Sequence, residues 1–211
     1  MKTRKTIYHI IVDKSGSMND CVDSTINGFN EQINSIKSKQ LQFPDEEMTI
    51  GLTAFSHEIK HHYFSLHPNL AIPLNEETYV PDGYTALYDA IGLTVESIEK
   101  DLRNASLAIP TTIVIVILTD GYENASKIYN LVKIRNLISR LEESKHWTFS
   151  FIGATLDAVE VATAMSIKSQ NSFQFQKEEM NSSVWKKLDS SLSHYFTKKQ
   201  DNRDLDNFFE A

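Results

Sequence analysis

The chain has 211 residues, of which 41% are hydrophobic and 23% charged, the composition of an ordinary soluble globular domain that is long enough to bury a core. Lys and Arg number 21 and Asp and Glu 28, and the formal charge of −7 argues against a broad nucleic-acid-binding surface and against a polybasic membrane contact. Cys21 is the only cysteine, which excludes an internal disulfide and a cysteine-based zinc site. Because the apolar runs at residues 7–12 and 113–118 are too short for a signal-peptide core or a membrane span, we expect a cytoplasmic protein.

The first half of the chain predicts three strands and one helix. Residues 6–12 are almost wholly apolar and largely β-branched, which is typical of a strand buried on both faces of a parallel sheet. A loop of small polar residues follows at 13–17. The helical spacing after it predicts a helix whose inner face is Val22, Ile26, Phe29, Ile33 and Ile36. Residues 48–55 and 59–66 predict two strands with a three-residue connection, so we expect an antiparallel hairpin at the sheet edge.

The second half alternates helices with strands. After an irregular stretch with three prolines, a helix is predicted from about Thr85, and residues 112–118 form the most continuous apolar run, which indicates the sheet centre. The remaining predicted elements are a helix that Ser126 can cap, with Leu131, Ile134, Ile138 and Leu141 inward, a strand at 147–152, a short helix at 158–165, a strand at 172–175 and a helix at about 178–196. This alternation indicates an α/β sheet sandwiched between helices, with one domain over residues 1–199. Residues 200–211 are acidic, and we expect them to form a loose tail.

Oxygen-bearing side chains gather where apolar strands end. Asp13 and Asp120 each end a strongly apolar strand, and Ser15, Ser17 and Thr85 lie beside glycines in loops. In an open parallel sheet, ligands bind outside the carboxyl ends of the strands where strand order reverses, so the two carboxylates converge if their strands are neighbours. A set of carboxylates and hydroxyls without nitrogen or sulfur suits Mg²⁺, Mn²⁺ or Ca²⁺.

These residues resemble the von Willebrand factor type A (vWA) family. Asp13-Lys14-Ser15-Gly16-Ser17 resembles its D-x-S-x-S motif, Gly83-Tyr84-Thr85 resembles the segment that supplies a threonine, and Thr119-Asp120-Gly121 resembles the one that supplies an aspartate. The resemblance covers roughly residues 6–197. More narrowly, five segments are similar to stand-alone vWA proteins of bacteria and phages: Gly28-Phe29-Asn30, Tyr79-Val80-Pro81, residues 84–90, residues 119–124 and Phe151-Ile152-Gly153-Ala154.

The resemblance implies a fold and a function. It implies a doubly wound, Rossmann-like fold with six strands in the order 3-2-1-4-5-6 and strand 3 antiparallel. It also implies a metal-ion-dependent adhesion site (MIDAS), in which the ligands of a Mg-type ion are Asp13, Ser15, Ser17, Thr85 and Asp120. In the family the usual activity is protein binding, in which an Asp or Glu of the partner completes the coordination, so we expect no enzyme activity.

Two alternatives remain open. A Mg²⁺-dependent phosphatase or phosphotransferase also places an aspartate after its first strand, with Asp13 as the nucleophile here. Such enzymes usually carry a second acid two residues on, where this chain has Ser15, and no phosphate-binding Gly-x-x-x-x-Gly-Lys motif is present. The other alternative is an adaptor whose metal ion is only structural.

Other residues near the predicted ligands or in the hairpin are assigned less specific roles. Lys14, Met18, Tyr84 and Tyr122 flank the predicted ligands and are candidates for partner contact. Asp89 is expected to be a solvated helix residue rather than a support of the site, and Glu123 an exposed loop residue rather than part of its rim. The histidines of the hairpin region are expected to be solvated rather than zinc ligands; they are His57, His61, His62 and His67.

Overall fold

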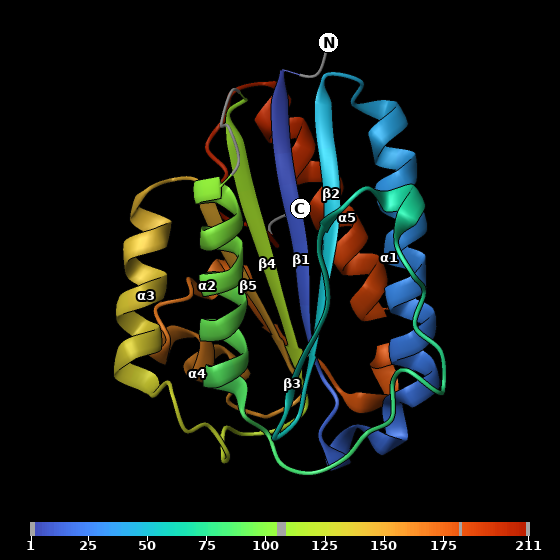
Figure 1. The fold of residues 1–211 in the computed structure, drawn as a ribbon, viewed down its shortest axis with the longest axis vertical. Helices are drawn as coiled ribbons and strands as arrows, with labels where there is room; N and C mark the ends of the chain where they lie inside the picture. Colours follow the sequence, from blue (N-terminus) through green and yellow to red (C-terminus); the bar gives the residue numbers. More distant parts are fainter. Residues whose placement is uncertain (1–2, 105–108, 182, 210–211) are drawn as a thin grey trace.

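A six-stranded sheet forms the centre of the molecule in the computed structural model, which describes residues 3–104, 109–181 and 183–209 (Figure 1). The strand order is β3-β2-β1-β4-β5-β6, with β3 antiparallel to β2 and the other neighbouring pairs parallel. The strands are β1 (Arg4–Asp13), β2 (Glu46–Phe55), β3 (Ile59–Leu66), β4 (Thr111–Thr119), β5 (Trp147–Gly153) and β6 (Ser172–Gln174). The predicted order and the antiparallel third strand are confirmed.

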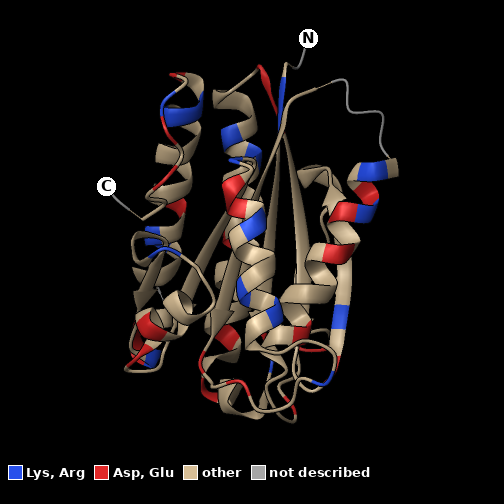
Figure 2. Ribbon diagram, turned by 90° about the vertical axis from the view of Figure 1, so that its left-hand side faces the viewer, with Lys and Arg blue, Asp and Glu red and all other residues tan. Residues whose placement is uncertain are grey.

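Helices cover both faces of the sheet. The helices are α1 (Val22–Gln42), α2 (Leu87–Asn104), α3 (Leu131–Glu143), α4 (Ala158–Ala164) and α5 (Ser183–Gln200). Helices α1 and α5 lie on one face, and α2, α3 and α4 on the other (Figure 1). None of the helices in the described part of the chain combines the length and the apolarity that crossing a bilayer requires. In Figure 2, Lys and Arg positions are interspersed with Asp and Glu along the helices.

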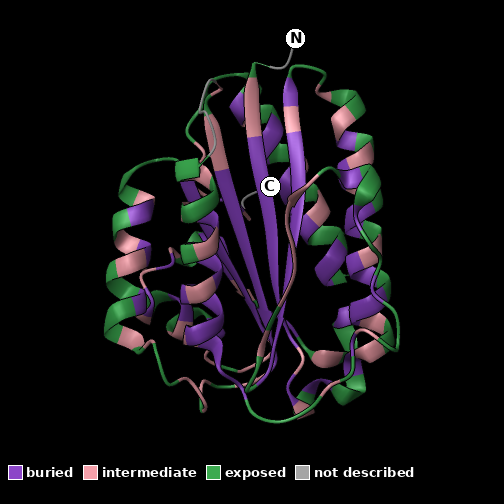
Figure 3. Cartoon of the chain, viewed as in Figure 1, coloured by how far each residue is buried: buried purple, intermediate pink, exposed green. Residues whose placement is uncertain are grey.

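Alternate residues of β1 belong to two separate hydrophobic cores. Tyr8, Ile10 and Val12 pack in the core beneath α1 and α5, whereas Ile7 and Ile11 pack in the core beneath α2, α3 and α4. The central strands are therefore buried on both sides, as Figure 3 shows, and this explains why their sequences are continuously apolar rather than alternating.

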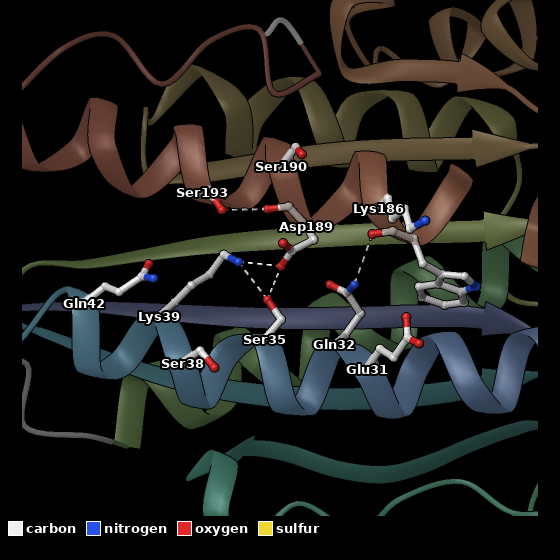
Figure 4. Close-up of a pocket in the computed structure, with 11 residues that line it drawn as sticks. Glu31, Gln32, Ser35, Ser38, Lys39, Gln42, Lys186, Asp189, Ser190 and Ser193 are labelled. Carbon is white, nitrogen blue, oxygen red and sulfur yellow. Dashed lines mark hydrogen bonds and ion pairs between the residues drawn. The ribbon is translucent and has the colours of Figure 1, made fainter. Parts of the chain in front are cut away.

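A polar groove of about 580 Å³ runs between α1 and α5 (Figure 4). Within it, Lys39 Nζ lies 2.5 Å from Asp189 Oδ1 and donates to Ser35 Oγ at 2.7 Å. Gln32 Nε2 donates to the Trp185 carbonyl at 3.4 Å. The charges of Lys39 and Asp189 thus pair with each other, which joins the two helices.

The expectation of a loose C-terminal tail is wrong for the residues up to 209. Phe208 is only 2% exposed, and its backbone N–H donates to Asn171 Oδ1 at 2.7 Å. Phe209 meets Phe173 edge to face with ring centroids 4.8 Å apart. Asp206 pairs with Lys168 and, at 3.4 Å, with Lys145. The segment packs because its two adjacent aromatic rings bury apolar area. The acidic residues around them had suggested a solvated tail.

Two helix boundaries also differ from the prediction. Asn130, not Ser126, caps α3, since its side chain accepts the Lys133 N–H at 3.0 Å. The last helix begins later than expected, because a 3₁₀ turn, η4 (Lys177–Asn181), precedes α5.

We predict that Phe208→Ala lowers the free energy of unfolding by about 3 kcal/mol, because it removes a buried aromatic ring from a packed core. Chemical denaturation followed by circular dichroism measures the change. Leu41→Ala is the control, since Leu41 is 83% exposed and its loss is expected to cost less than about 0.5 kcal/mol. Equal stability of Phe208→Ala and the wild type would contradict packing of the tail.

Candidate functional site

Two aspartates meet at one edge of the sheet because their strands are neighbours. Asp13 is the last residue of β1, and Asp120 directly follows β4. The strands pair in parallel, with Val12 opposite Leu118, so both chains leave the sheet at the same edge. This edge lies at the bottom of Figure 1, where the loops gather. The two strands are therefore neighbours, which is the condition under which the carboxylates of Asp13 and Asp120 were expected to converge.

Hydrogen bonds link four of the five predicted side chains. Ser17 Oγ donates to Asp120 Oδ1 at 2.6 Å, and the hydroxyls of Ser15 and Ser17 lie 3.2 Å apart. The Ser15 backbone N–H donates to Asp13 Oδ1 at 2.6 Å. Ser17 belongs to a 3₁₀ turn, η1 (Gly16–Cys21), which bends the chain sharply after β1. The D-x-S-x-S spacing thus turns three side chains toward the end of β4.

Gly121 marks the space that these oxygens surround. A Cβ atom at Gly121 would lie 3.1 Å from Thr85 Oγ1, 3.6 Å from Ser17 Oγ and 3.9 Å from Asp13 Oδ2. Thr85 therefore joins the group from the loop before α2, and the structure brings all five predicted side chains together. The absence of a side chain at Gly121 keeps this space open.

The loop that carries Thr85 is fixed by backbone contacts. The Thr85 N–H donates to Asn124 Oδ1 at 2.8 Å, and the Asn124 N–H donates to the Thr85 carbonyl at 3.0 Å. Gly83 has φ +70°, a left-handed conformation, and its carbonyl accepts the Gly16 N–H at 3.1 Å. A Cβ at Gly83 would lie 1.9 Å from His57 Nδ1, so glycine is required there for both reasons.

Asp13 is fully buried, and its surroundings hold it firmly. Its Oδ2 accepts the Thr119 hydroxyl at 2.6 Å, and its carbonyl accepts the Tyr79 hydroxyl at 2.5 Å. Burial raises the pKa of Asp13 to about 6, although hydrogen bonds from Thr119 and Ser15 oppose the rise. Sequence reasoning missed Thr119, Tyr79 and Asn124 as supports of the site. Only Thr119, which lies directly before Asp120, carried a signal in its position.

One basic residue also reaches the site. Lys177 Nζ, at the start of η4, lies 2.6 Å from Asp120 Oδ2 and donates to the Ser17 carbonyl at 2.8 Å. Partial burial opposes the charge of Lys177, but the ion pair with Asp120 raises the pKa of Lys177 above the usual value. Sequence reasoning missed Lys177, because it lies in no motif and more than fifty residues from Asp120.

Comparison with known proteins settles the family. The model of the von Willebrand factor type A domain matches residues 9–191, most of the chain. The chain belongs to the von Willebrand factor type A domain family. No curated protein matches it by sequence.

Solved structures share the fold of this vWA domain. Proximal thread matrix protein 1 from the mussel byssus, with its MIDAS motif occupied by zinc, is 13% identical with a TM-score of 0.62 over 91% of this chain and 48% of that one. The vWF domain of the type V pilus tip protein Mfa5 from Porphyromonas gingivalis is 9% identical with a TM-score of 0.60, over 92% and 96% of the two chains. The PilB minor pilin from Streptococcus sanguinis is 14% identical with a TM-score of 0.61, over 91% and 62%. This chain spans about half the length of the mussel proteins, and identities this low show the fold alone.

Two acidic residues near the site of the vWA domain are less exposed than expected, Asp89 being buried and Glu123 half-buried. Asp89 is 4% exposed, and its carboxylate accepts three backbone N–H groups, from Lys127 at 2.8 Å, Ile128 at 3.0 Å and Tyr129 at 2.7 Å. Glu123 accepts the Tyr88 N–H at 2.8 Å at the start of α2. Both residues therefore tie the loop after β4 to the beginning of α2, so Asp89 has the supporting role that the sequence favoured less than solvent exposure.

The candidate partner contacts differ in exposure. Tyr84 and Tyr122 are 70% and 55% exposed, whereas Met18 is buried and unable to touch a partner. The Tyr122 hydroxyl donates to Asp157 Oδ1 at 2.9 Å, which connects the loops after β4 and β5. Tyr84 and Tyr122 remain the exposed aromatic groups next to predicted ligands.

The hairpin histidines are only partly solvated. His57 is exposed, but His61 is half-buried, and its Nδ1 lies 3.0 Å from Thr53 Oγ1, which in turn lies 2.9 Å from Nε2 of the buried His9. Within residues 3–104, 109–181 and 183–209, no group of three or more His, Cys, Asp or Glu side chains is placed to hold a metal ion.

We predict that, with a chelator present, raising the pH from about 4 to about 6 lowers the free energy of unfolding of the wild type. The decrease is expected to be on the order of 1–2 kcal/mol larger than that of Asp13→Asn. The folded-state pKa of Asp13, about 6, lies above its unfolded value of about 3.9. The folded protein therefore binds more protons in this window, and its free energy of unfolding decreases as pH rises. Urea titrations at several pH values measure both profiles. Parallel profiles would show that Asp13 ionises normally in the folded state.

Proposed function

We propose that this vWA domain is a divalent-metal-dependent protein-binding module. In the proposal, Asp13, Ser15, Ser17, Thr85 and Asp120 hold a Mg-type ion, directly or through water, and an Asp or Glu carboxylate of a protein partner completes its coordination. The observation that carries the proposal is the convergence of oxygens around Gly121, where one point lies within 4 Å of three side-chain oxygens from three separate segments.

The donor chemistry supports a hard cation. Every predicted ligand offers oxygen, and such sets suit Mg²⁺, Mn²⁺ or Ca²⁺. The zinc in the MIDAS motif of the mussel protein adds Zn²⁺ to the ions worth testing. The carboxylates of Asp13 and Asp120 carry two negative charges, which equal the charge of one divalent ion. The Asp120 carboxylate also faces Lys177, so it would neutralise the ion only in part. An ion held in this way would attract a further carboxylate.

Exposed aromatic residues support partner binding at the same edge. Tyr84 and Tyr122 follow Gly83 and Gly121 directly in sequence, and both rings are largely exposed. Aromatic side chains are frequent energetic centres of protein interfaces. We therefore propose that they contact the partner beside its carboxylate.

The phosphatase alternative has less support. A nucleophilic aspartate must expose an oxygen to the phosphorus atom, but the Asp13 side chain is buried and both of its oxygens accept hydrogen bonds. We propose a binding module without enzyme activity. We also propose a cytoplasmic location. The free, buried thiol of Cys21 is consistent with it, because thiols stay reduced in that compartment.

We predict that Mg²⁺ raises the melting temperature of the wild type by about 5–10 °C at a concentration about 100 times the dissociation constant, because the ion binds only the folded state. Gly121→Ala should reduce or abolish the shift, since the new methyl group enters the space among the ligand oxygens. Asp13→Ala should abolish it as well. Differential scanning calorimetry with and without MgCl₂ measures the shifts.

Gly16→Ala is the matched control for Gly121→Ala. Neither glycine has a positive φ, and a Cβ at Gly16 would meet only the Gly83 carbonyl, at an ordinary 3.5 Å. Gly16→Ala should therefore keep the full shift. A wild type that responds to none of Mg²⁺, Mn²⁺, Ca²⁺ and Zn²⁺ would refute the metal site, and a full shift in Gly121→Ala would place the ion elsewhere.

We predict that a protein partner is recovered from source-cell lysate on immobilised wild-type domain in MgCl₂ and is lost in chelator or on immobilised Asp13→Ala. Mass spectrometry identifies the partner, and substitution of its contacting Asp or Glu should weaken binding at least about tenfold, as expected for loss of a buried charged contact. Equal recovery with and without chelator would instead favour the adaptor whose metal ion is only structural.

A further inference from the structure

Lys177 brings a positive charge into the site from a distant part of the chain. It lies in η4, between β6 and α5, and its ammonium is 2.6 Å from Asp120 Oδ2. The Asp120 side chain is 0% exposed, and that of Lys177 is 35% exposed. The ion pair therefore joins a fully buried carboxylate to a lysine that still reaches solvent.

The two oxygens of Asp120 have different surroundings. Oδ1 accepts the Ser17 hydroxyl at 2.6 Å, a contact between two predicted ligands. Oδ2 is buried and accepts no hydrogen bond of good geometry, so the ammonium of Lys177 is its charge partner. An anionic oxygen that faces an ammonium is also a group that a divalent cation would bind.

An ammonium and a divalent cation are poor neighbours at this distance. Like charges a few ångströms apart repel each other, and the double charge of the ion strengthens the repulsion. Lys177 also has a route away from the site, since its side chain is one-third exposed and ends a flexible four-carbon stem. Its second contact is a single hydrogen bond, to the Ser17 carbonyl at 2.8 Å.

We propose that Lys177 is a built-in competitor of the metal ion: it pairs with Asp120 when the ion is absent, withdraws when the ion binds, and so sets the ion concentration at which the site fills. This inference rests on the proposed function, because it requires that the site binds a divalent ion. A merely structural ion pair would make the opposite prediction, since its loss would loosen the site and weaken the binding of the ion.

The test compares the Mg²⁺ affinity of charge variants by isothermal titration calorimetry with MgCl₂. Lys177→Met removes the ammonium but keeps an apolar stem, and the dissociation constant for Mg²⁺ is expected to fall about tenfold. Lys177→Arg keeps the charge and is expected to stay within about threefold of the wild type. Lys100→Met is the matched control, because it removes one positive charge from an exposed position near the far end of α2 and should leave the affinity unchanged.

A second measurement follows the ammonium itself. Acylation of the Lys177 amine, quantified by mass spectrometry, should increase when MgCl₂ saturates the site, whereas acylation of Lys100 should not change. Circular dichroism checks folding, and Lys177→Gln replaces Lys177→Met if the latter fails to fold.

The possible outcomes separate the inference from the proposed function. If the wild type binds Mg²⁺ and Lys177→Met binds it equally or more weakly, the competition is refuted and the metal site stands. Unchanged acylation of Lys177 in the saturated protein would also refute its withdrawal. If neither the wild type nor the variant binds any of the four ions, the proposed function fails and the inference fails with it.

Discussion

The parallel pairing of β1 with β4 is the contact on which the rest of the site depends. Both strands are buried on their two faces, so their pairing and register are fixed by two hydrophobic cores rather than by the loops. Because the strands run in the same direction, the residues that follow them are brought to one edge, and these residues are Asp13 and Asp120. The energy that holds two like charges near each other thus comes from apolar packing elsewhere in the sheet.

The loops at this edge are held by side chains that do not belong to the oxygen cluster. Asn124 fixes Thr85 through two hydrogen bonds, and Asp89 and Glu123 bind backbone N–H groups between α2 and the loop after β4. A hydroxyl on a mobile loop would lose much of its affinity for an ion to the entropy of ordering. These contacts order the loops in advance, so they would reduce that loss for the ion that we propose.

The sheet order and the gathering of the five side chains could be predicted through the resemblance to the vWA family, whereas the strands and helices themselves follow from local patterns. Continuous apolar runs mark the buried strands, and the D-x-S-x-S segment lies within one turn of chain. The roles of Lys177, Asn124 and Tyr79 could not be predicted, since each acts on a residue from which it is separated by 39 or more positions. Tyr79 and Asn124 lie in segments that resemble vWA proteins, but the resemblance assigned them no contact, and Lys177 lies in no such segment. The packing of Phe208 was missed because the acidic residues around it suggested solvent, whereas Lys145 and Lys168, far away in sequence, supply the compensating charge.

The two-sided burial of β1 also limits how the chain can change in length. Side chains along a strand alternate between faces, so one inserted or deleted residue within β1 would move Tyr8, Ile10 and Val12 into the wrong core and turn the Asp13 carboxylate away from β4. Length variation should instead be tolerated at the β3 edge of the sheet, where the strand is only half-buried and its pairing with β2 already contains shifts in register. Insertion of a reporter sequence would therefore be better tolerated at the Leu66 end of β3 than within β1, because the other end of β3 follows His57, which lies against Gly83 in the site loop.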